Sequence, residues 1–200
     1  MAHPVFIWAV EWPIFWRGMA PLLDPMPGEV GLLGSEGLRS VHYSEDIIIH
    51  RPIVAGDVLD TIAKLVCVES KAKGSTSIVQ CESSDSHGNK VVTAWSGFYY
   101  RGTQLEGKAA MAERCMPPSV PSVPERRNPS AFELDVSAVE AHVYSECSRI
   151  WNPIHTDRAA ALSAGLPDII LHGTAILARA VSKLVSYFLK DDPRRVRRVV

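Results

Sequence analysis

The sequence lacks the features that would assign it at once to a large protein class. Its four cysteines include no C-x-x-C pair, which argues against a zinc site and a disulfide framework (Cys67, Cys81, Cys115 and Cys147). The formal net charge of −1 over 200 residues gives no reason to expect nucleic acid or anionic lipid as a partner. No apolar run reaches the roughly 20 residues of a membrane span. These absences favour a globular protein of a reducing compartment.

The longest apolar stretch, residues 4–19, is interrupted by a carboxylate, a proline and an arginine (Glu11, Pro13 and Arg17). It has no basic leader and no small-residue cleavage site, so it is a poor signal peptide. Its tryptophans recur every four residues, which predicts a helix with one aromatic face buried in the protein or covered by a partner (Trp8, Trp12 and Trp16). An amphipathic membrane anchor is the alternative, but the stretch has few of the basic residues that such anchors use.

The next part of the chain has the pattern of antiparallel strands. Asp85–Asn89, DSHGN, predicts a hairpin turn, because Gly and Asn tolerate the positive φ that such turns require. Strands of this length joined by tight turns predict an antiparallel meander. Four extended segments make up this part: Leu38–Arg51, Val58–Ser70, Ser75–Ser83 and Val91–Arg101.

Residues 105–130 are rich in proline and show no sustained periodicity, which indicates a semi-extended linker. The linker divides the chain into a first part, residues 1–104, and a second part, residues 131–200. Beyond the linker the sequence predicts one short strand and three helices: a strand at Phe132–Asp135, a helix capped by Ser137 with Glu140 in a capping box, and helices at Asp157–Ala164 and Gly173–Lys190.

The tetrapeptide Asn152-Pro153-Ile154-His155 predicts a rigid corner. Pro153 has a fixed φ and no amide hydrogen, and it drives Asn152 into an extended conformation with its side chain free to bond nearby backbone. The corner would present His155 at the start of the next helix, where the neutral imidazole that a general base needs is favoured. The competing interpretation is a surface histidine on a turn.

A second His-Gly pair follows at His172 and Gly173. The glycine lets backbone approach a ligand closely, and it stands where the amide donors of the long helix are unpaired. Donors placed in this way can polarise a thioester carbonyl and stabilise an enolate-like oxygen. The competing interpretation is a glycine needed for tight helix packing, with His172 as its buried neighbour.

Taken together, residues 144–180 resemble the MaoC-like and R-specific enoyl-CoA hydratases (hydratase 2) of the hot-dog fold. Their signature is Ser-Gly-Asp-x-Asn-Pro-x-His, followed by a Pro-Ile-(Ile/Leu)-His-Gly run. Residues 43–101 look like the strand half of a first hot dog in the two-hot-dog members of that family. The matching positions are Ser148, Asn152, Pro153, Ile154, His155, Leu171, His172 and Gly173.

The resemblance implies an α+β fold in which an antiparallel sheet wraps around a central helix, in two tandem copies (a double hot dog). Residues 4–19 would be the central helix of the first copy, on the acyl-tail side, and would line a hydrophobic tunnel. Helix 173–190 would be that of the second copy, which carries the chemistry. Compared with the family, elements are expected to be missing at both ends, either because a partner supplies them or because the sequence is a fragment. The resemblance also implies a homo- or hetero-oligomer formed by hot-dog pairing.

The activity implied is the reversible hydration or dehydration of the α,β-bond of an acyl thioester, an enoyl-CoA or a polyketide-like substrate. His155 would be the general acid or base and Asn152 would fix its loop. His172 and Gly173 would bind the substrate, with the glycine amide on the thioester carbonyl. No metal or other cofactor is implied beyond the CoA-type substrate itself.

Two positions depart from the signature, since the catalytic Asp is replaced by Ile150 and the preceding glycine by Arg149. An isoleucine cannot carry a proton, so another carboxylate has to replace it or the chemistry differs. The nearby candidates are Glu146, Asp157 and Asp168.

Two alternatives follow from Ile150. One is a non-catalytic subunit that binds an acyl thioester, and the other is a hot-dog enzyme of secondary metabolism with different chemistry, such as isomerisation or thioester hydrolysis. Four arginines in residues 193–200 could meet the phosphates of a CoA-type ligand, or form a solvated charged face. The cytoplasm is the expected compartment, with peroxisome and mitochondrion left open.

Overall fold

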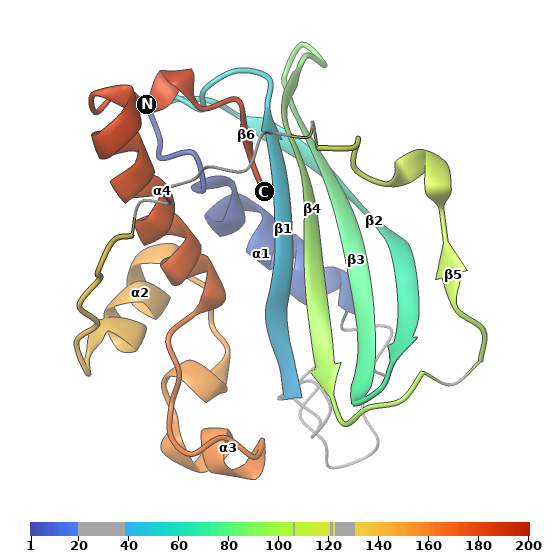
Figure 1. Ribbon diagram of the computed structural model, residues 1–200. Helices are drawn as coiled ribbons and strands as arrows, with labels where there is room; N and C mark the ends of the chain where they lie inside the picture. The colour runs from blue at the N-terminus through green and yellow to red at the C-terminus, as the bar shows by residue number, and fades with distance from the viewer. Residues whose placement is uncertain (20–38, 106, 121, 123–130) are drawn as a thin grey trace.

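The structure, a computed structural model, describes residues 1–19, 39–105, 107–120, 122 and 131–200, without the side chains of residues 16–19. The expected α+β class is confirmed, because one antiparallel sheet packs with four α-helices (Figure 1). The helices are α1 (Ile7–Met19), α2 (Glu140–Ser148), α3 (Arg158–Ser163) and α4 (Gly173–Leu189). The strands are β1 (Ser40–Ile49), β2 (Leu59–Lys71), β3 (Gly74–Asp85), β4 (Lys90–Arg101), β5 (Ala110–Met111) and β6 (Arg198–Val199).

The sheet has the strand order β5-β2-β3-β4-β1-β6, and each adjacent pair is antiparallel. Strands β2, β3 and β4 form the expected hairpins. In the β3–β4 turn, Asp85 Oδ1 accepts from the amides of His87 and Asn89, and Gly88 has a φ of +78°. This confirms the hairpin that the sequence predicts at residues 85–89.

The meander prediction is wrong for the first strand, because β1 pairs with β4 and not with β2. Pairing with β4 places Ile47 opposite Ala94 in the buried centre of the sheet. The chain then passes to β2 through residues 50–58, where Arg51 holds both Asp57 and Asp85. Burial of apolar side chains at the centre of the sheet thus outweighs the tendency of consecutive strands to pair.

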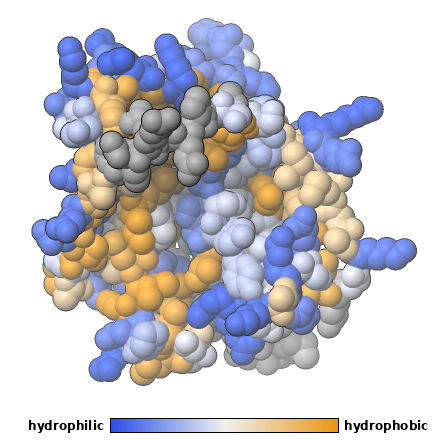
Figure 2. All heavy atoms as spheres, viewed as in Figure 1, coloured by the Kyte–Doolittle hydropathy of each residue, from blue (hydrophilic) through white to orange (hydrophobic). Residues whose placement is uncertain are grey.

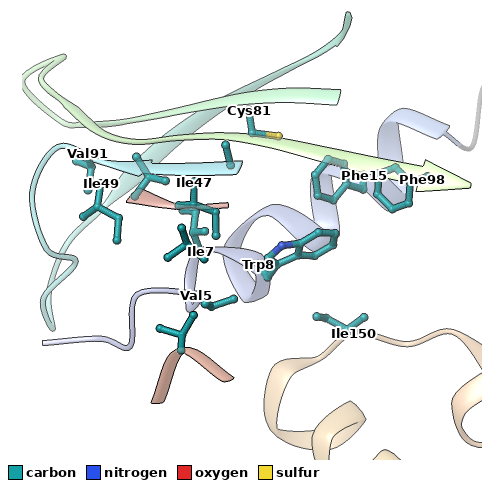
Figure 3. Packing of buried hydrophobic residues seen from close by; sticks show 14 of the residues in the cluster. Val5, Ile7, Trp8, Phe15, Ile47, Ile49, Cys81, Val91, Phe98 and Ile150 are labelled. Atoms are coloured by element: carbon teal, nitrogen blue, oxygen red, sulfur yellow. The ribbon is translucent and has the colours of Figure 1, made fainter. Parts of the chain in front are cut away.

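The helix that the sequence predicts at residues 4–19 is confirmed as α1, and it lies across one face of the sheet (Figure 1). Trp8 and Phe15 are each only 2% exposed and pack edge-to-face against Phe98 of β4 (Figure 3). The aromatic face that we expected to line an acyl tunnel is therefore filled by protein side chains. Trp12 is half-buried, and the side chain of Trp16 lies outside the described residues.

Helix α4 packs against the opposite side of this core through Val181 and Val185. The predicted helices at residues 157–164 and 173–190 are confirmed, and Asp157 caps α3 by accepting from two amides. The strand that the sequence predicts at residues 132–135 is absent from this described segment.

Ser137 does not cap α2 as predicted. The N-cap is Val139, which offers no side-chain acceptor, and only the Ser137 amide meets Glu140, at 3.4 Å from its Oε2. The serine hydroxyl half of the capping box is not formed because the helix begins two residues later than the pattern suggests.

Two short strands were not anticipated. β5, inside the proline-rich segment, pairs with β2, and β6 pairs with β1 at the opposite edge of the sheet. Arg198 of β6 holds Asp46 through two short bonds and also donates to the carbonyls of Pro118 and Ser119. The linker residues that the structure describes thereby contact both edges of the sheet.

The outer face of α4 keeps large apolar side chains exposed, and α2 adds others beside it. Figure 2 shows apolar side chains gathered on the left of the view, over these helices. The exposed members are Val139, Val143, Ile176, Leu184, Tyr187 and Phe188. Among the described residues, no helix combines the length and the apolar character that a membrane crossing requires.

Candidate active site

His155 lies in a short 3-10 turn, η5 (Pro153–His155), one turn before α3. Asn152 precedes the turn in the extended conformation predicted for a residue before proline, and its Oδ1 accepts from the Ile154 amide at 3.3 Å. The side chain of Asn152 therefore closes the corner, as the sequence predicts. The histidine belongs to the corner itself and not to the start of α3, where we expected it.

The imidazole of His155 has a fixed tautomer. Its Nδ1 is 2.7 Å from the carbonyl oxygen of Ile170, and a carbonyl can only accept, so Nδ1 carries the hydrogen. The lone pair is then on Nε2. Burial lowers the pKa of His155, and the Ile170 bond only partly opposes this. The neutral form that we predicted from a helix N-terminus is therefore favoured by a different cause, desolvation.

His172 is stacked directly on His155, with ring centroids 3.6 Å apart. Its Nε2 is 3.2 Å from both the Ile150 carbonyl oxygen and Ser145 Oγ, so Nε2 carries the hydrogen. The buried Nδ1 has no partner among the described residues. Burial lowers the pKa of His172 to about 3, with a smaller effect from His155. His172 is thus neutral near pH 7, and its ring supports that of His155 from one side.

Gly173 follows as the first residue of α4. Its amide and that of Thr174 meet no acceptor among the described residues, whereas the next two amides donate to the His172 carbonyl. A Cβ at Gly173 would lie 2.9 Å from Nδ1 of His42, on strand β1. The glycine therefore permits a close contact between the two parts of the chain, which is the packing role left open from the sequence, and it also leaves free donors at the helix start.

Ile150 occupies the position of the family's carboxylate, and it is only 4% exposed. Its side chain lies in the main apolar cluster, near Trp8 at the end of the loop that follows α2 (Figure 3). Its carbonyl oxygen, not its side chain, reaches His172. Arg149 before it adopts a φ of 58°, a left-handed conformation that favours glycine, which accounts for the glycine of the signature.

The three carboxylates proposed to replace the missing one lie elsewhere. Asp157 caps α3, Asp168 pairs with Arg158 on the surface, and Glu146 is exposed. Within the described part of the chain, no hydrogen bond or ion pair joins any of them to His155 or His172. The sequence did not single out Glu45, a buried carboxylate that is linked to the site through a neighbouring histidine. It is bonded to His42, which in turn contacts Gly173.

Two of the four C-terminal arginines form ion pairs with aspartates of this chain. Arg194 is paired with Asp192, and Arg198 with Asp46. An open pocket of about 820 Å³ lies beside Arg194 and Lys190, at the C-terminal end of α4. Since a helix of 17 residues spans about 25 Å, this pocket is far from the imidazoles at the other end. No group of three or more metal-ligating side chains gathers anywhere in the described ranges.

The geometry brings together all four residues predicted from the sequence. His155 offers a fixed Nε2 lone pair, Asn152 holds its turn, His172 backs the ring, and Gly173 exposes amide donors one residue further on. A lone pair beside free donors at a helix start can take a proton from water while an oxygen gains negative charge nearby.

Comparison with known proteins finds relatives of the second part of the chain and of the fold. Residues 122–199 match the family model described as MaoC like domain. The chain is 24% identical over 176 residues to a protein of Dictyostelium discoideum named probable enoyl-CoA hydratase 2, a match that covers 82% of this chain and 58% of that protein. The chain thus spans little more than half the length of this relative.

Solved structures bear out the fold. A MaoC-like dehydratase from Phytophthora capsici superimposes with a TM-score of 0.68 at 24% identity, covering 94% of this chain and 64% of that one. A Mycobacterium tuberculosis protein with a double hot-dog fold matches with a TM-score of 0.53 at 12% identity, covering 93% of this chain and 60% of the other. The antiparallel sheet around α1 is accordingly a hot-dog sheet. Residues 122–199 are thus similar in sequence to the MaoC-like domain, and the fold of the chain is similar to that of a MaoC-like dehydratase.

Proposed function

We propose that the protein catalyses the reversible hydration of the α,β-double bond of an acyl thioester. His155 takes a proton from water as the oxygen bonds to the β-carbon, and the Gly173 amide holds the thioester oxygen as it gains negative charge. Asn152 keeps the turn rigid, and His172 fixes the plane of the His155 ring. The observation that carries the proposal is the tautomer of His155, since its Nδ1 is held by a carbonyl and its Nε2 lone pair is left available.

The substrate class follows from the same residues and from the relative's name, probable enoyl-CoA hydratase 2. An α,β-unsaturated acyl thioester has both parts that the site can address, an electrophilic carbon for the activated water and a carbonyl for the free amide. No metal or redox cofactor takes part in this scheme.

The test is the hydration of crotonyl-CoA by the purified full chain. The loss of the enoyl absorbance measures the rate. Replacing His155 with Ala is expected to lower kcat by about 10²–10⁴-fold, the usual contribution of a general base. His87→Ala, in the exposed β3–β4 turn, is the matched control and should leave the rate unchanged. Equal rates for the two variants would overturn the role of His155.

The second candidate is a subunit that binds an acyl thioester without turning it over, and the burial of Ile150 favours it. That position holds no side chain able to carry a proton, so one half of the family's acid–base pair is absent. Tight binding of butyryl-CoA by a parent protein that does not hydrate crotonyl-CoA would select this candidate.

We further propose that the chain works in an assembly formed by hot-dog pairing, in the cytoplasm or in an organelle that oxidises fatty acids, such as the peroxisome or mitochondrion. The exposed apolar face of α4 supports pairing, since contiguous apolar surface often marks an interaction site. Analytical ultracentrifugation of the purified chain tests it, and a monomer at micromolar concentration would contradict it.

A further inference from the structure

A histidine–carboxylate pair lies in the sheet, outside the signature motif, and faces the same helix start as the proposed site. His42 Nε2 is 3.0 Å from Glu45 Oε2. The carboxyl group is buried and accepts two further bonds, from Trp8 Nε1 at 2.9 Å and from Ser96 Oγ at 3.2 Å. Three donors around one carboxylate favour its ionised form, although burial raises the pKa of Glu45.

Strand β1 can form this pair only because it is irregular. In a regular strand, side chains three residues apart point to opposite faces of the sheet. The register of β1 against β4 shifts between His42 and Ser44, so Tyr43 is an extra, unpaired residue. A bulge of this kind re-aims the side chains on either side of it, and it brings His42 and Glu45 to the same face.

The second nitrogen of His42 points towards the site. With Nε2 occupied by Glu45, Nδ1 is the atom that lies nearest to the space above Gly173, 2.9 Å from where a Cβ would stand. No described residue bonds to Nδ1, and the His42 side chain keeps 15% of its surface exposed. The imidazole is therefore oriented by a carboxylate at one nitrogen, and its other nitrogen lies against Gly173, the residue whose amide we assign to the thioester oxygen.

Hydration requires two proton movements, and His155 accounts for one of them. The α-carbon must also receive a proton, and the acidic residue of the signature is replaced by the buried Ile150. Resting on the function proposed above, we propose that His42 is the second catalytic residue, which delivers a proton from Nδ1 to the α-carbon while Glu45 positions it and stabilises its charged form.

The proton and electron balance is as follows. Water gives one hydrogen to His155 Nε2, its oxygen bonds to the β-carbon, and the double-bond electrons move to the thioester oxygen held by Gly173. The electrons return as the α-carbon bonds to the hydrogen of His42 Nδ1–H, which leaves His42 neutral with its Nε2–H still on Glu45. The proton on His155 returns to His42 through solvent, so one water is added and both imidazoles are restored.

The charged groups around His42 come from three elements. Glu45 is on its own strand, and Glu11 of α1 lies close enough to Glu45 for each charge to disfavour the other. Glu11 has no donor among the described residues, whereas Glu45 has three, so the negative charge resides on Glu45. The start of α4 opposes a positive charge on His42, and the carboxylate of Glu45 favours it.

The experiment compares two replacements of His42 in the full chain. His42→Gln can still donate to Glu45 from its Nε2 but has no proton to give at the Nδ1 position, so it isolates proton transfer from packing. We expect it to lower kcat for crotonyl-CoA by about 10²–10⁴-fold. Binding of butyryl-CoA should stay within about threefold. His50→Gln, at an exposed histidine directly after the same strand, is the control with unchanged rate.

A structural role alone predicts a different result. His42→Gln would then turn over crotonyl-CoA within about threefold of the parent, and this outcome overturns the inference while the proposed function stands. His42→Ala gives a second readout, because added imidazole should restore part of its rate only if a proton is transferred.

If the parent protein does not hydrate crotonyl-CoA, the proposed function is wrong. One further measurement then tests whether His42 lies at the bound thioester. The ¹⁵N resonance of its Nδ1 is followed by NMR as butyryl-CoA is added. A shift of the resonance at saturation would show that the thioester binds beside His42. An unchanged resonance would show that His42 is not part of the binding site.

Discussion

Helix α1 and helix α4 are the two long helices of the molecule, and they are buried to different extents. Helix α1 lies between the sheet and α4, and Ile7, Trp8 and Phe15 on it are 2% exposed or less. Helix α4 is covered on one side only, and its outer face keeps Ile176 and Tyr187 more than half exposed. The sheet and helix α1 form one part, the sheet-covered part, and residues 131–190 with α2, α3 and α4 form the helical part. The sheet-covered part supplies most of the apolar burial that stabilises the fold.

The groups that we propose to be functional are divided differently. His155, His172 and the free Gly173 amide belong to the helical part, whereas His42 and Glu45 belong to the sheet. These groups meet where the start of α4 approaches β1. Substitutions inside the sheet-covered core should therefore change stability first, and substitutions at this junction should change both stability and activity.

The largest effect is expected at Ile150, where the helical part enters the core. Replacing it with Asp removes a buried aliphatic side chain and buries a carboxyl group, which should cost about 3–5 kcal/mol of unfolding free energy. Ile150→Val is the control, with a loss of about 0.5–1.5 kcal/mol. Urea denaturation measures both. An Ile150→Asp protein that is as stable as the parent and hydrates crotonyl-CoA faster would place this side chain in the site instead.

The contact between the two parts is tested at Gly173. A methyl group there would be forced against His42, so Gly173→Ala should lose about 1–3 kcal/mol of stability through overpacking. Adding His42→Ala should restore most of that loss, since the pair is then no longer in conflict. A double-mutant cycle from thermal denaturation measures this coupling. Strict additivity of the two substitutions would mean that the helix start and β1 do not touch.

The buried Glu11 should make the sheet-covered part less stable than its packing allows. Its pKa is raised well above the usual value, mainly by burial, so the folded state keeps the proton at a pH where the unfolded chain releases it. Stability is consequently lost as pH rises above about 4.5. Glu11→Met should add about 1–3 kcal/mol at pH 7 and less at pH 4.

Chemical denaturation at the two pH values checks this, with the exposed Glu113→Met as control. A less stable Glu11→Met protein at pH 7 would indicate that the carboxyl has a partner that stabilises it.

The smallest effect is expected at the end of α2. Arg149 has a left-handed conformation that costs a non-glycine residue about 1–2 kcal/mol, whereas glycine loses about 0.5–1 kcal/mol more conformational entropy on folding. Arg149→Gly should therefore gain at most about 1.5 kcal/mol. Lys190→Gly, at the end of α4 with a φ of 53°, should gain a similar amount. A loss at Arg149 with a gain at Lys190 would show that the arginine side chain stabilises the helical part.

The features that could be predicted from the sequence are those set by local pattern. Alternating apolar residues gave the four long strands, and Asn152 before Pro153 gave the rigid turn. The pairing of β1 with β4 could not be predicted in this way, because it depends on which strands share the core beneath α1. The two-residue strands β5 and β6 are too short for any periodicity.

The His42–Glu45 pair shows why part of the proposed site was missed. A His and a Glu three residues apart suggest neighbours on a helix, but in an extended segment this spacing points them to opposite faces. Only the bulge at Tyr43 reverses this, and no turn residue marks it. Glu11, which lies in an apolar helix, could have been flagged as a buried carboxylate, since a charged residue amid tryptophans is unusual.

The pH dependence of kcat/KM for crotonyl-CoA tests the central claim most directly, because it reports the ionisation of the free enzyme. His155 must be neutral to act as a base, and burial lowers its pKa from 6.5. The rate constant should therefore stay level as pH falls through 6.5 and decline only in more acidic buffer. A rate constant that has already halved at pH 6.5 or above, or a protein with no turnover at any pH, would contradict the assignment of His155 as the base.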